Sequence, residues 1–294
     1  MTGSRFLRLC LVLLAAGRVL SYMDEGESVE ATMTERNLRS RIVGGTKADP
    51  KRHPYFTQLR ITFYDYWSDT YPAYNCGGTL IGKDVVLTAA HCLTSENSWE
   101  ELYSVDTWVN ATSIYYSPYE YPGTGRVYSI HPSYDSSTIA HDIALLYLDT
   151  GVTGVTLAKI NKSMSTPAAG KAVTAIGLGL LKRPDEVKAT YLMQVSMNTL
   201  VGSSCSNLYG STYFKTANQI CAGSTKNICQ GDSGGPLLLK GTTASKDSVA
   251  GIMSYSYSEA CGTKPSGFTR VSKYARWIET DICDYSYYPP STCP

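Results

Sequence analysis

Short runs of β-branched, aliphatic and aromatic residues recur along most of the chain, and clusters of Gly, Pro, Asn and Ser separate them. The runs lie at 55–63, 78–82, 85–88, 142–148, 172–177, 192–197, 235–239, 249–254 and 267–271. Many short strands bounded by turn residues are typical of β-sandwiches and β-barrels. Because no repeat of about 20 to 50 residues is evident, solenoids and propellers are excluded. The pattern therefore predicts an all-β fold.

A helical pattern is found close to the C-terminal end. Over 272–282 the apolar side chains are spaced for one face of a helix, and Ser272 is placed to cap its first turn. The face consists of Tyr274, Trp277, Ile278 and Ile282. We expect one C-terminal helix there, and we interpret the segment 95–125 as a loop.

The N-terminal residues have the layout of an export signal. Two Arg residues precede the apolar run 9–16, and small residues follow up to Ser21. The run is too short to span a bilayer, and no later stretch approaches the roughly 18 apolar residues of a membrane helix. A buried strand beginning at Phe6 is the alternative. We expect a signal peptide at 1–21 and secretion of the product to the extracellular space without a membrane anchor.

Residues 22–41 are polar, rich in Glu and without hydrophobic periodicity, and they end in three Arg residues, Arg36, Arg39 and Arg41. Such a segment is typical of a flexible linker or a propeptide.

The charge balance excludes some functions. The chain has 26 Lys and Arg against 25 Asp and Glu. Residues 1–41 hold 6 of the basic and 5 of the acidic side chains, so 20 of each remain in the other 253 residues. A neutral protein lacks the basic surface of a nucleic-acid binder and attracts no substrate by long-range charge.

The cysteine count agrees with secretion. One of the nine, Cys10, lies in the signal, and an even number in an oxidising compartment predicts four disulfides. The remaining eight are Cys76, Cys92, Cys205, Cys221, Cys229, Cys261, Cys283 and Cys293. Neither Cys-x-x-Cys nor His-x-x-x-His spacing occurs, so we expect no zinc site.

Three strings carry candidate chemistry. Gly-Asp-Ser-Gly-Gly-Pro at 231–236 places a hydroxyl in a tight turn whose N–H groups could face an oxyanion. Ala-Ala-His-Cys at 89–92 and Asp-Ile-Ala-Leu-Leu at 142–146 add a base and a carboxylate. Taken singly, each has a structural explanation: a Gly-rich hairpin, a structural His and a strand-capping Asp.

Together, these strings and their order resemble the trypsin/chymotrypsin family of serine proteases, and the resemblance runs from Ile42 to Cys283. It implies two six-stranded antiparallel β-barrels, with a boundary near 155, followed by a tail at 284–294. It also implies that Ser233 is the nucleophile, His91 the general base and acid, and Asp142 the carboxylate that orients the imidazole. The N–H groups of Gly231 and Ser233 would form the oxyanion hole, and no cofactor or metal would be needed.

The string Arg-Ile-Val-Gly-Gly at 41–45 resembles the activation site of the family. The resemblance implies that 22–41 is an activation propeptide, that another protease cuts after Arg41, and that the new ammonium of Ile42 pairs with Asp232. It also implies three disulfide pairs, Cys76–Cys92, Cys205–Cys221 and Cys229–Cys261. Cys283 and Cys293 are then paired by elimination.

The residues at the family's substrate pocket depart from the trypsin pattern. Asn227 stands where trypsins have an Asp for Lys and Arg, Ser256 and Ser266 replace Gly, and Tyr255 replaces Trp. Ser254 matches the Ser that donates to the triad carboxylate. We expect cleavage after medium-sized uncharged residues.

Several features outside these strings also bear on function. The insert 64–75 is rich in Tyr and Trp, which fits either a substrate or partner surface or an inert loop. Two sequons begin at Asn110 and Asn161 and predict a glycoprotein. Four carboxylates are candidate calcium ligands, but they do not reproduce the family's cluster, so calcium binding is not favoured: Glu100, Glu101, Asp106 and Glu120.

The resulting hypothesis is a secreted, monomeric serine endopeptidase, made as a zymogen, whose partners are protein or peptide substrates. The alternative is a protease-like binding or inhibitor protein, which would typically have lost a triad residue. An α/β-hydrolase esterase would carry Gly-x-Ser-x-Gly between a strand and a helix, which this chain does not.

Overall fold

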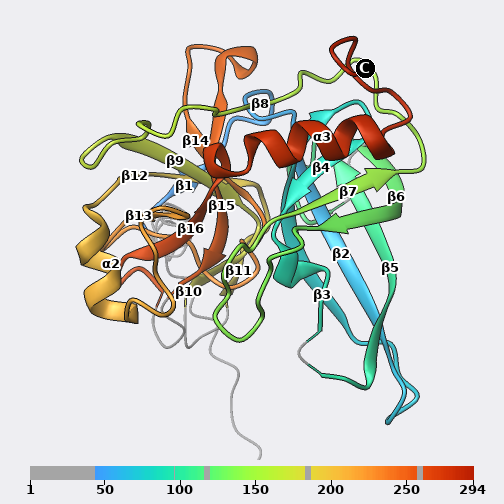
Figure 1. Ribbon diagram of the computed structural model, residues 1–294, viewed down its shortest axis with the longest axis horizontal. Helices are drawn as coiled ribbons and strands as arrows, with labels where there is room; N and C mark the ends of the chain where they lie inside the picture. Colours follow the sequence, from blue (N-terminus) through green and yellow to red (C-terminus); the bar gives the residue numbers. More distant parts are fainter. Residues whose placement is uncertain (1–43, 96, 116–119, 183–186, 257–260) are drawn as a thin grey trace, which may run out of the picture. The chain divides into compact units, whose positions relative to one another are not determined.

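Six strands from the first half of the sequence close into a barrel in the order β2-β3-β4-β7-β6-β5 (Figure 1). They are β2 (Phe56–Asp65), β3 (Ala73–Gly82), β4 (Val85–Thr88), β5 (Glu100–Val109), β6 (Tyr121–Ile130) and β7 (Ala144–Leu148). In β2 the side chains of Leu59, Ile61 and Phe63 alternate inward and are fully or almost fully buried, as the period of a strand requires. β7 is buried at every position.

The second half forms a curled sheet in the order β1-β12-β9-β14-β15-β16-β13, with β8 beside β15. Its strands are β1 (Thr46–Lys47), β8 (Lys159–Ile160), β9 (Ala172–Gly177), β12 (Met193–Asn198), β13 (Gln219–Ala222), β14 (Pro236–Leu239), β15 (Ser248–Tyr255) and β16 (Ser266–Arg270). A bridge between Thr199 and Ala222 joins the end of β12 to β13. Six strands of this sheet thus approach a barrel, but a single bridge closes the seam, so the second barrel is less regular than expected.

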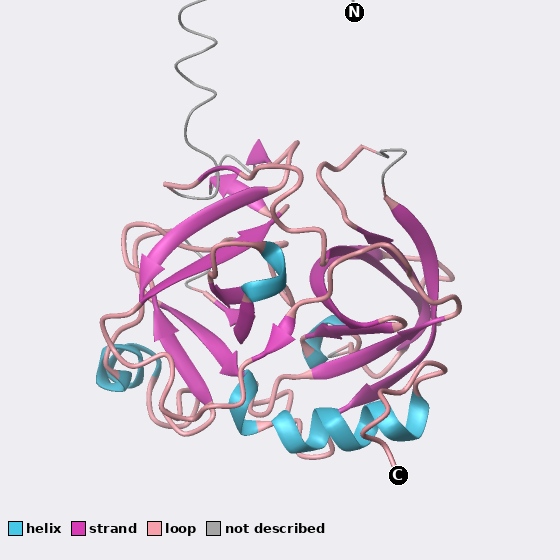
Figure 2. Ribbon diagram, turned by 90° about the horizontal axis from the view of Figure 1, so that it is seen from above, coloured by secondary structure: helices cyan, strands magenta, loops and turns pink. Residues whose placement is uncertain are grey.

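Two helices and a small hairpin complete the described fold. The hairpin pairs β10 (Leu180–Lys182) with β11 (Val187–Lys188), and α2 (Gly202–Tyr209) covers one side of the second sheet. The C-terminal α3 (Ala275–Tyr285) docks on the first barrel, where its Asp281 accepts hydrogen bonds from Ser129 and Tyr147 at 2.6 Å each. Figure 2 shows the two groups of strands side by side with α3 along one edge.

The computed structural model describes residues 44–95, 97–115, 120–182, 187–256 and 261–294. The expected signal peptide, the propeptide and the Arg41–Ile42 bond lie outside the described residues. Within them, no helix is long and apolar enough to cross a membrane.

All nine predicted strands overlap observed ones, but two other expectations were wrong. The segment 95–125 is not a loop, because it contains β5, which pairs with β2 over its whole length, and the start of β6. The helix begins at Ala275 rather than 272, and Ser272 does not cap it, because Ser272 is buried in a preceding 3₁₀ turn at Val271–Lys273.

The two halves are tied together in several places. The expected boundary near 155 falls between β7 and β8, yet β1, at the N-terminal side, pairs with β12 of the second sheet. A largely buried network links the start of β2 to the start of β15: Nη1 and Nη2 of Arg52 and the hydroxyl of Tyr55 donate to the carboxylate of Asp247. The tie orients one barrel against the other.

The C-terminal tail is bound to the first barrel. The buried carboxylate of Asp84 accepts hydrogen bonds from the Ser286 hydroxyl at 2.5 Å and the Tyr287 N–H at 2.8 Å. Arg126 lies 3.7 Å from that carboxylate and stacks over the Tyr287 ring. The tail therefore covers a charged site that would otherwise face solvent.

Candidate active site

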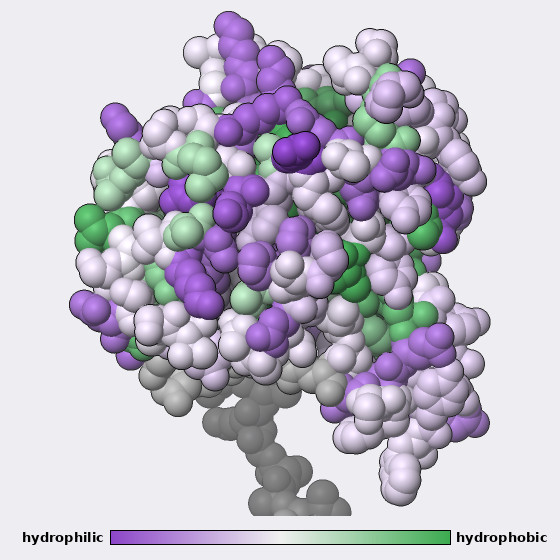
Figure 3. All heavy atoms as spheres, viewed as in Figure 1, coloured by the Kyte–Doolittle hydropathy of each residue, from purple (hydrophilic) through white to green (hydrophobic). Residues whose placement is uncertain are grey.

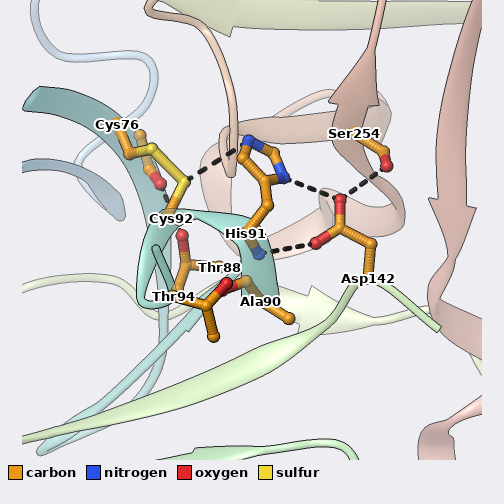
Figure 4. The surroundings of a disulfide bond; sticks show 9 residues. Cys76, Thr88, Ala90, His91, Cys92, Thr94, Asp142 and Ser254 are labelled. Atoms are coloured by element: carbon orange, nitrogen blue, oxygen red, sulfur yellow. Dashed lines mark hydrogen bonds and ion pairs between the residues drawn. A yellow bond between two sulfur atoms is a disulfide. The ribbon is translucent and has the colours of Figure 1, made fainter. Parts of the chain in front are cut away.

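His91 and Asp142 lie in direct contact between the two barrels. Nδ1 of His91 is 2.8 Å from Oδ2 of Asp142, and the backbone N–H of His91 donates to Oδ1 at 2.9 Å (Figure 4). Because a carboxylate only accepts, Nδ1 carries the proton of this contact, and in the neutral imidazole Nε2 is then the basic nitrogen. Asp142 thus fixes both the tautomer and the orientation of the ring.

The carboxylate of Asp142 is fully buried and held from the second sheet. The Ser254 hydroxyl on β15 donates to Oδ2 at 2.5 Å, as the family resemblance implied, and the Thr269 hydroxyl on β16 donates to the Asp142 carbonyl at 2.8 Å. His91 comes from the 3₁₀ turn after β4, and Asp142 comes just before β7. The first barrel therefore supplies both members of the pair, and the second sheet holds Asp142 in place.

Ser233 lies on a turn that backbone hydrogen bonds hold on both sides. Its carbonyl accepts from the Gly77 N–H of the first barrel at 2.7 Å. The next N–H, of Gly234, donates to the Met253 carbonyl of the second sheet at 2.8 Å. Met253 immediately precedes the Ser254 that contacts Asp142, so the turn and the carboxylate share one support.

Glycine allows this turn to approach the strand that leads to His91. Gly234 has φ +77°, and a Cβ on it would lie 2.3 Å from the Thr88 hydroxyl and 2.4 Å from the Gly77 carbonyl. Only glycine combines a positive φ with such close backbone contact. The Gly-Asp-Ser-Gly string and the Ala-Ala-His-Cys string are thus packed directly against each other.

The N–H groups of the turn fall into two classes. Those of Asp232, Gly234 and Gly235 donate to backbone carbonyls. Those of Gly231 and Ser233 have no acceptor among the described residues. Two unpaired N–H donors beside a partly exposed serine are the arrangement that an oxyanion requires.

The carboxylate of Asp232 is fully buried next to Ser233. It accepts from the Gly179 N–H at 2.8 Å and the Cys229 N–H at 2.9 Å, and no cation of the described chain pairs with it. Burial raises the pKa of Asp232 to about 6, although the two N–H donors act to lower it. A buried anion with only dipoles around it lacks the counter-ion that would stabilise it.

The expected substrate pocket is lined by polar but neutral groups. The buried Asn227 amide donates to the Lys264 carbonyl at 2.8 Å and accepts the Ile228 N–H at 2.9 Å. The Ser266 hydroxyl is buried and has no hydrogen-bond partner in the described structure. The Tyr255 ring covers Gly267, where a Cβ would lie 2.3 Å from it. Ser256 is half-buried at the end of the described segment.

A separate open cavity of about 590 Å³ lies on the other side of Gly231. Its walls include Gln230, Leu178 and the β3 residues Ala73, Tyr74 and Asn75. Asn227 and Ser266 do not line it, so this recess beyond Gly231 is distinct from the expected substrate pocket.

The structure contains the four expected disulfides, Cys76–Cys92, Cys205–Cys221, Cys229–Cys261 and Cys283–Cys293. Cys76–Cys92 lies beside His91, with Cys92 Sγ 3.9 Å from Nε2. These three residues are the one group of potential metal ligands among the described residues. Since both sulfurs are oxidised to a disulfide, they offer no thiolate to a metal.

Two expectations outside the site change. Glu100, Glu101 and Asp106 lie along β5 rather than in a loop, and consecutive residues of a strand point to opposite faces. The amide nitrogen of Asn161, which would carry a glycan, is buried and donates to the Thr166 carbonyl at 2.7 Å. The same nitrogen donates to the Ser163 carbonyl at 3.2 Å, and a glycan would replace one of its two hydrogens and so remove one of these bonds. Glycosylation at the half-buried Asn110 stays a prediction.

Sequence reasoning missed the residues that make room for Asp232. A Cβ on Gly177 would lie 2.1 Å from Oδ1 of Asp232, and one on Gly179 would lie 2.6 Å from its Cγ. The Gly-Leu-Gly string at 177–179 is present in the sequence, but nothing in it indicates which side chain the two glycines make room for. Thr269 was also missed, because an isolated Thr in a strand carries no signal.

Comparison with known proteins gives consistent results. The family model described as Trypsin matches residues 42–278. A granzyme-like protein 1 of Rattus norvegicus is 34% identical over 82% of this chain and 90% of its own length. A chymase of Rattus norvegicus is 31% identical and Trypsin Blo t 3 of Blomia tropicalis is 30% identical, each over 92% of this chain and 95% of the relative.

Proposed function

Because the chain belongs to the trypsin family and is a serine endopeptidase, we propose that it cleaves peptide bonds with Ser233, His91 and Asp142 as its catalytic triad. The observation that carries the proposal is the His91–Asp142 contact, packed against the turn that bears Ser233. Nε2 of His91 takes the Ser233 proton as the hydroxyl attacks the carbonyl, and it then gives the proton to the leaving amine. Asp142 stabilises the imidazolium without being protonated.

The N–H groups of Gly231 and Ser233 form the oxyanion hole in this proposal. Their lack of acceptors among the described residues supports it, because donors already paired would have to break a bond first. In other enzymes, removing one such donor raises the barrier by roughly 3 to 4 kcal/mol.

We also propose that the chain is secreted as a zymogen and activated by cleavage after Arg41. The counter-ion that Asp232 lacks would be the new ammonium of Ile42. Gly44, two residues further on, lies against Lys226 of the same loop, where a Cβ would be 2.7 Å from the Lys226 side chain. Ile42 precedes Gly44 by two residues, which span about 7 Å at most, so cleavage would free an ammonium within that chain length of Gly44.

The substrate residue before the scissile bond is proposed to be uncharged and of medium size, such as Leu or Met, with Gln or Asn also accepted. Asn227 offers a cation only a dipole, and losing a charge-assisted bond costs on the order of 1.5 to 3 kcal/mol. The hydroxymethyl groups of Ser256 and Ser266 narrow the pocket. The residues after the bond would enter the recess beyond Gly231.

Substitution of the nucleophile tests the triad. Ser233→Ala should abolish hydrolysis of a short peptide ester and leave the melting temperature unchanged, because the side chain is partly exposed and supplies chemistry rather than packing. The matched control is Ser206→Ala, which changes another partly exposed serine on α2 and should keep turnover within a few-fold. A fluorophosphonate should label Ser233 only in the processed wild type. Near-normal turnover by the Ser233→Ala protein would overturn the triad.

Processing is tested separately by Arg41→Gln. This variant should stay latent when exposed to a trypsin-like activator that switches on the wild type. Full activity of an intact chain beginning near Tyr22 would contradict the zymogen proposal.

A further inference from the structure

The β2–β3 hairpin and the start of β5 form an exposed surface with an unusual composition. We define the hairpin surface as residues 64–75 together with 97–106. Six of its aromatic side chains are at least 50% exposed: Tyr66, Trp67, Tyr71, Tyr74, Trp99 and Tyr103. Trp67, at the tip, is 90% exposed. Large aromatic side chains that cluster on a solvent-exposed surface commonly mark an interaction site.

The hairpin surface is also acidic. It contains five carboxylates and no Lys or Arg, whereas residues 42–294 as a whole have equal numbers of basic and acidic side chains. None of the five forms an ion pair with another described residue. They are Asp65, Asp69, Glu100, Glu101 and Asp106. Figure 3 shows this region as the protrusion at the lower right, where pale and purple residues are interspersed.

The surface is held in one conformation by its own contacts. Oδ1 of Asp65 accepts the N–H groups of Trp67 at 2.8 Å and Ser68 at 3.1 Å, which fixes the turn. The Tyr64 ring packs against Tyr66 at 4.7 Å and against Tyr71 at 5.1 Å between centroids. A surface that is already ordered loses little entropy when a partner binds.

The base of the same hairpin lines the recess beyond Gly231, through Ala73, Tyr74 and Asn75. Asn75 lies five residues from Thr70 in the turn, which corresponds to about 17 Å of extended strand. A substrate chain that leaves the recess along β3 therefore reaches the tip after about five residues.

We propose that the hairpin surface is an exosite for a basic, Lys- or Arg-bearing segment of a protein substrate, about five to ten residues beyond the scissile bond. Carboxylates at the rim attract a cationic side chain, and exposed Tyr and Trp faces bind it through cation–π contact. The inference rests on the proposed function, since it adds a second point of contact to the same substrate.

The test compares substrates that share their residues before the scissile bond. One is a short ester that ends at that bond, and two are peptides extended by twelve residues, with either Lys and Arg or Gln at positions five to ten. Wild type should cleave the basic peptide with kcat/KM about tenfold above the Gln peptide, mainly through KM. The advantage should shrink in about 0.5 M salt, where charges are screened within a few ångströms.

Two variants remove the features invoked. Trp67→Ser and the double variant Asp69→Asn/Glu101→Gln should each reduce the basic advantage to less than threefold and leave hydrolysis of the short ester unchanged. The matched controls are Tyr128→Ser and Asp284→Asn/Glu279→Gln, which change exposed residues elsewhere and should keep the full advantage. All these side chains are exposed, so folding is preserved.

The outcomes separate the two proposals. Equal cleavage of both long peptides by an enzyme that hydrolyses the short ester would overturn the exosite alone. If the ester is not cleaved, anisotropy of a labelled basic peptide with the Ser233→Ala protein still decides the matter: binding that Trp67→Ser abolishes supports the exosite, and no binding overturns it. A dimer that Trp67→Ser dissociates would show that a second copy is the occupant and would also overturn it.

Discussion

The buried position of the Asp232 side chain depends on two neighbouring residues that have no side chain. Its carboxylate fits only because residues 177 and 179 have no Cβ, and it is anchored by the N–H groups of Gly179 and Cys229. Burial raises the pKa of Asp232 to about 6, so keeping this carboxylate ionised near neutral pH lowers the stability of the uncleaved chain. The proposed role of the Ile42 ammonium is to offset that cost.

The first prediction concerns the pH dependence of this cost. A folded-state pKa raised from 3.8 to about 6 contributes stability below pH 4, and this stability is lost as the pH rises through 6. In the uncleaved Arg41→Gln protein, Asp232 should lower the free energy of unfolding by about 2–3 kcal/mol between pH 4 and pH 7. Adding Asp232→Asn should abolish this decrease. Urea unfolding at both pH values measures it. Identical pH dependence with and without Asp232→Asn would contradict the prediction.

The second prediction concerns the substrate pocket. Asn227→Asp places a carboxylate at the buried base, where it still accepts the Ile228 N–H but no longer donates to Lys264. Cleavage after Arg and Lys should rise at least tenfold relative to Leu, which corresponds to about 1.4 kcal/mol. A peptide library reports the ratio. Thr225→Asp, on the exposed part of the same loop, is the control and should change little.

At the residue scale, the sequence indicates the residues of the proposed triad but not the residues that hold them in place. Ser233, His91 and Asp142 stand in strings that were recognisable in one dimension. The partners that hold them, such as Thr269 and Gly77, lie far away in the chain and are brought close only by the pairing of strands.

Among the elements, β5 shows why a strand can escape detection. Val105, Thr107 and Val109 alternate inward, but the N-terminal half of the strand has two Glu and one Ser, contains no fully buried side chain and lies beside the exposed hairpin. Its pairing with β2 over nearly ten residues supplies backbone hydrogen bonds that the hydrophobic periodicity of the sequence does not predict. The runs that were predicted correctly are those with a buried face.

The third prediction addresses the tie between β2 and β15. Asp247→Asn should lower the free energy of unfolding by about 3 kcal/mol, because it leaves the partly buried Arg52 without its anion. Chemical denaturation measures the change. The exposed pair Lys162–Glu279 provides the contrast, since Glu279→Gln should cost under about 0.5 kcal/mol. A loss below about 1 kcal/mol for Asp247→Asn would show that the network is dispensable.

For the molecule as a whole, the predicted trypsin-like two-barrel fold is confirmed, but the second barrel is less regular than expected. The curled second sheet is closed by one bridge, and β1 crosses from the N-terminal side to join it. Such long-range pairing depends on the completed tertiary structure. The tail at 284–294 lies beyond the end of the family resemblance, yet it forms part of the surface of the first barrel.

The fourth prediction follows from that contact. A chain ending at Tyr285, with Cys283→Ser to avoid a free thiol, should melt at least about 5 °C below the full chain, because it loses the Ser286 and Tyr287 donors to Asp84. Scanning calorimetry measures the shift. Cys283→Ser/Cys293→Ser in the full chain separates the disulfide from these hydrogen bonds. An unchanged melting temperature in the shortened chain would refute the role assigned to the tail.

The Asp84 contact also sets an order of events during synthesis. Asp84 leaves the ribosome about two hundred residues before Ser286 and Tyr287 do, which is roughly 10 to 40 s at ordinary rates of translation. Throughout that interval the strands around it can pair, but the carboxylate has only Arg126 to satisfy it. The first barrel is therefore synthesised first but completed last. In a nascent chain stalled near its C-terminus, the Asp84 site would still lack Ser286 and Tyr287, and the quality-control machinery would meet the barrel in this incomplete form.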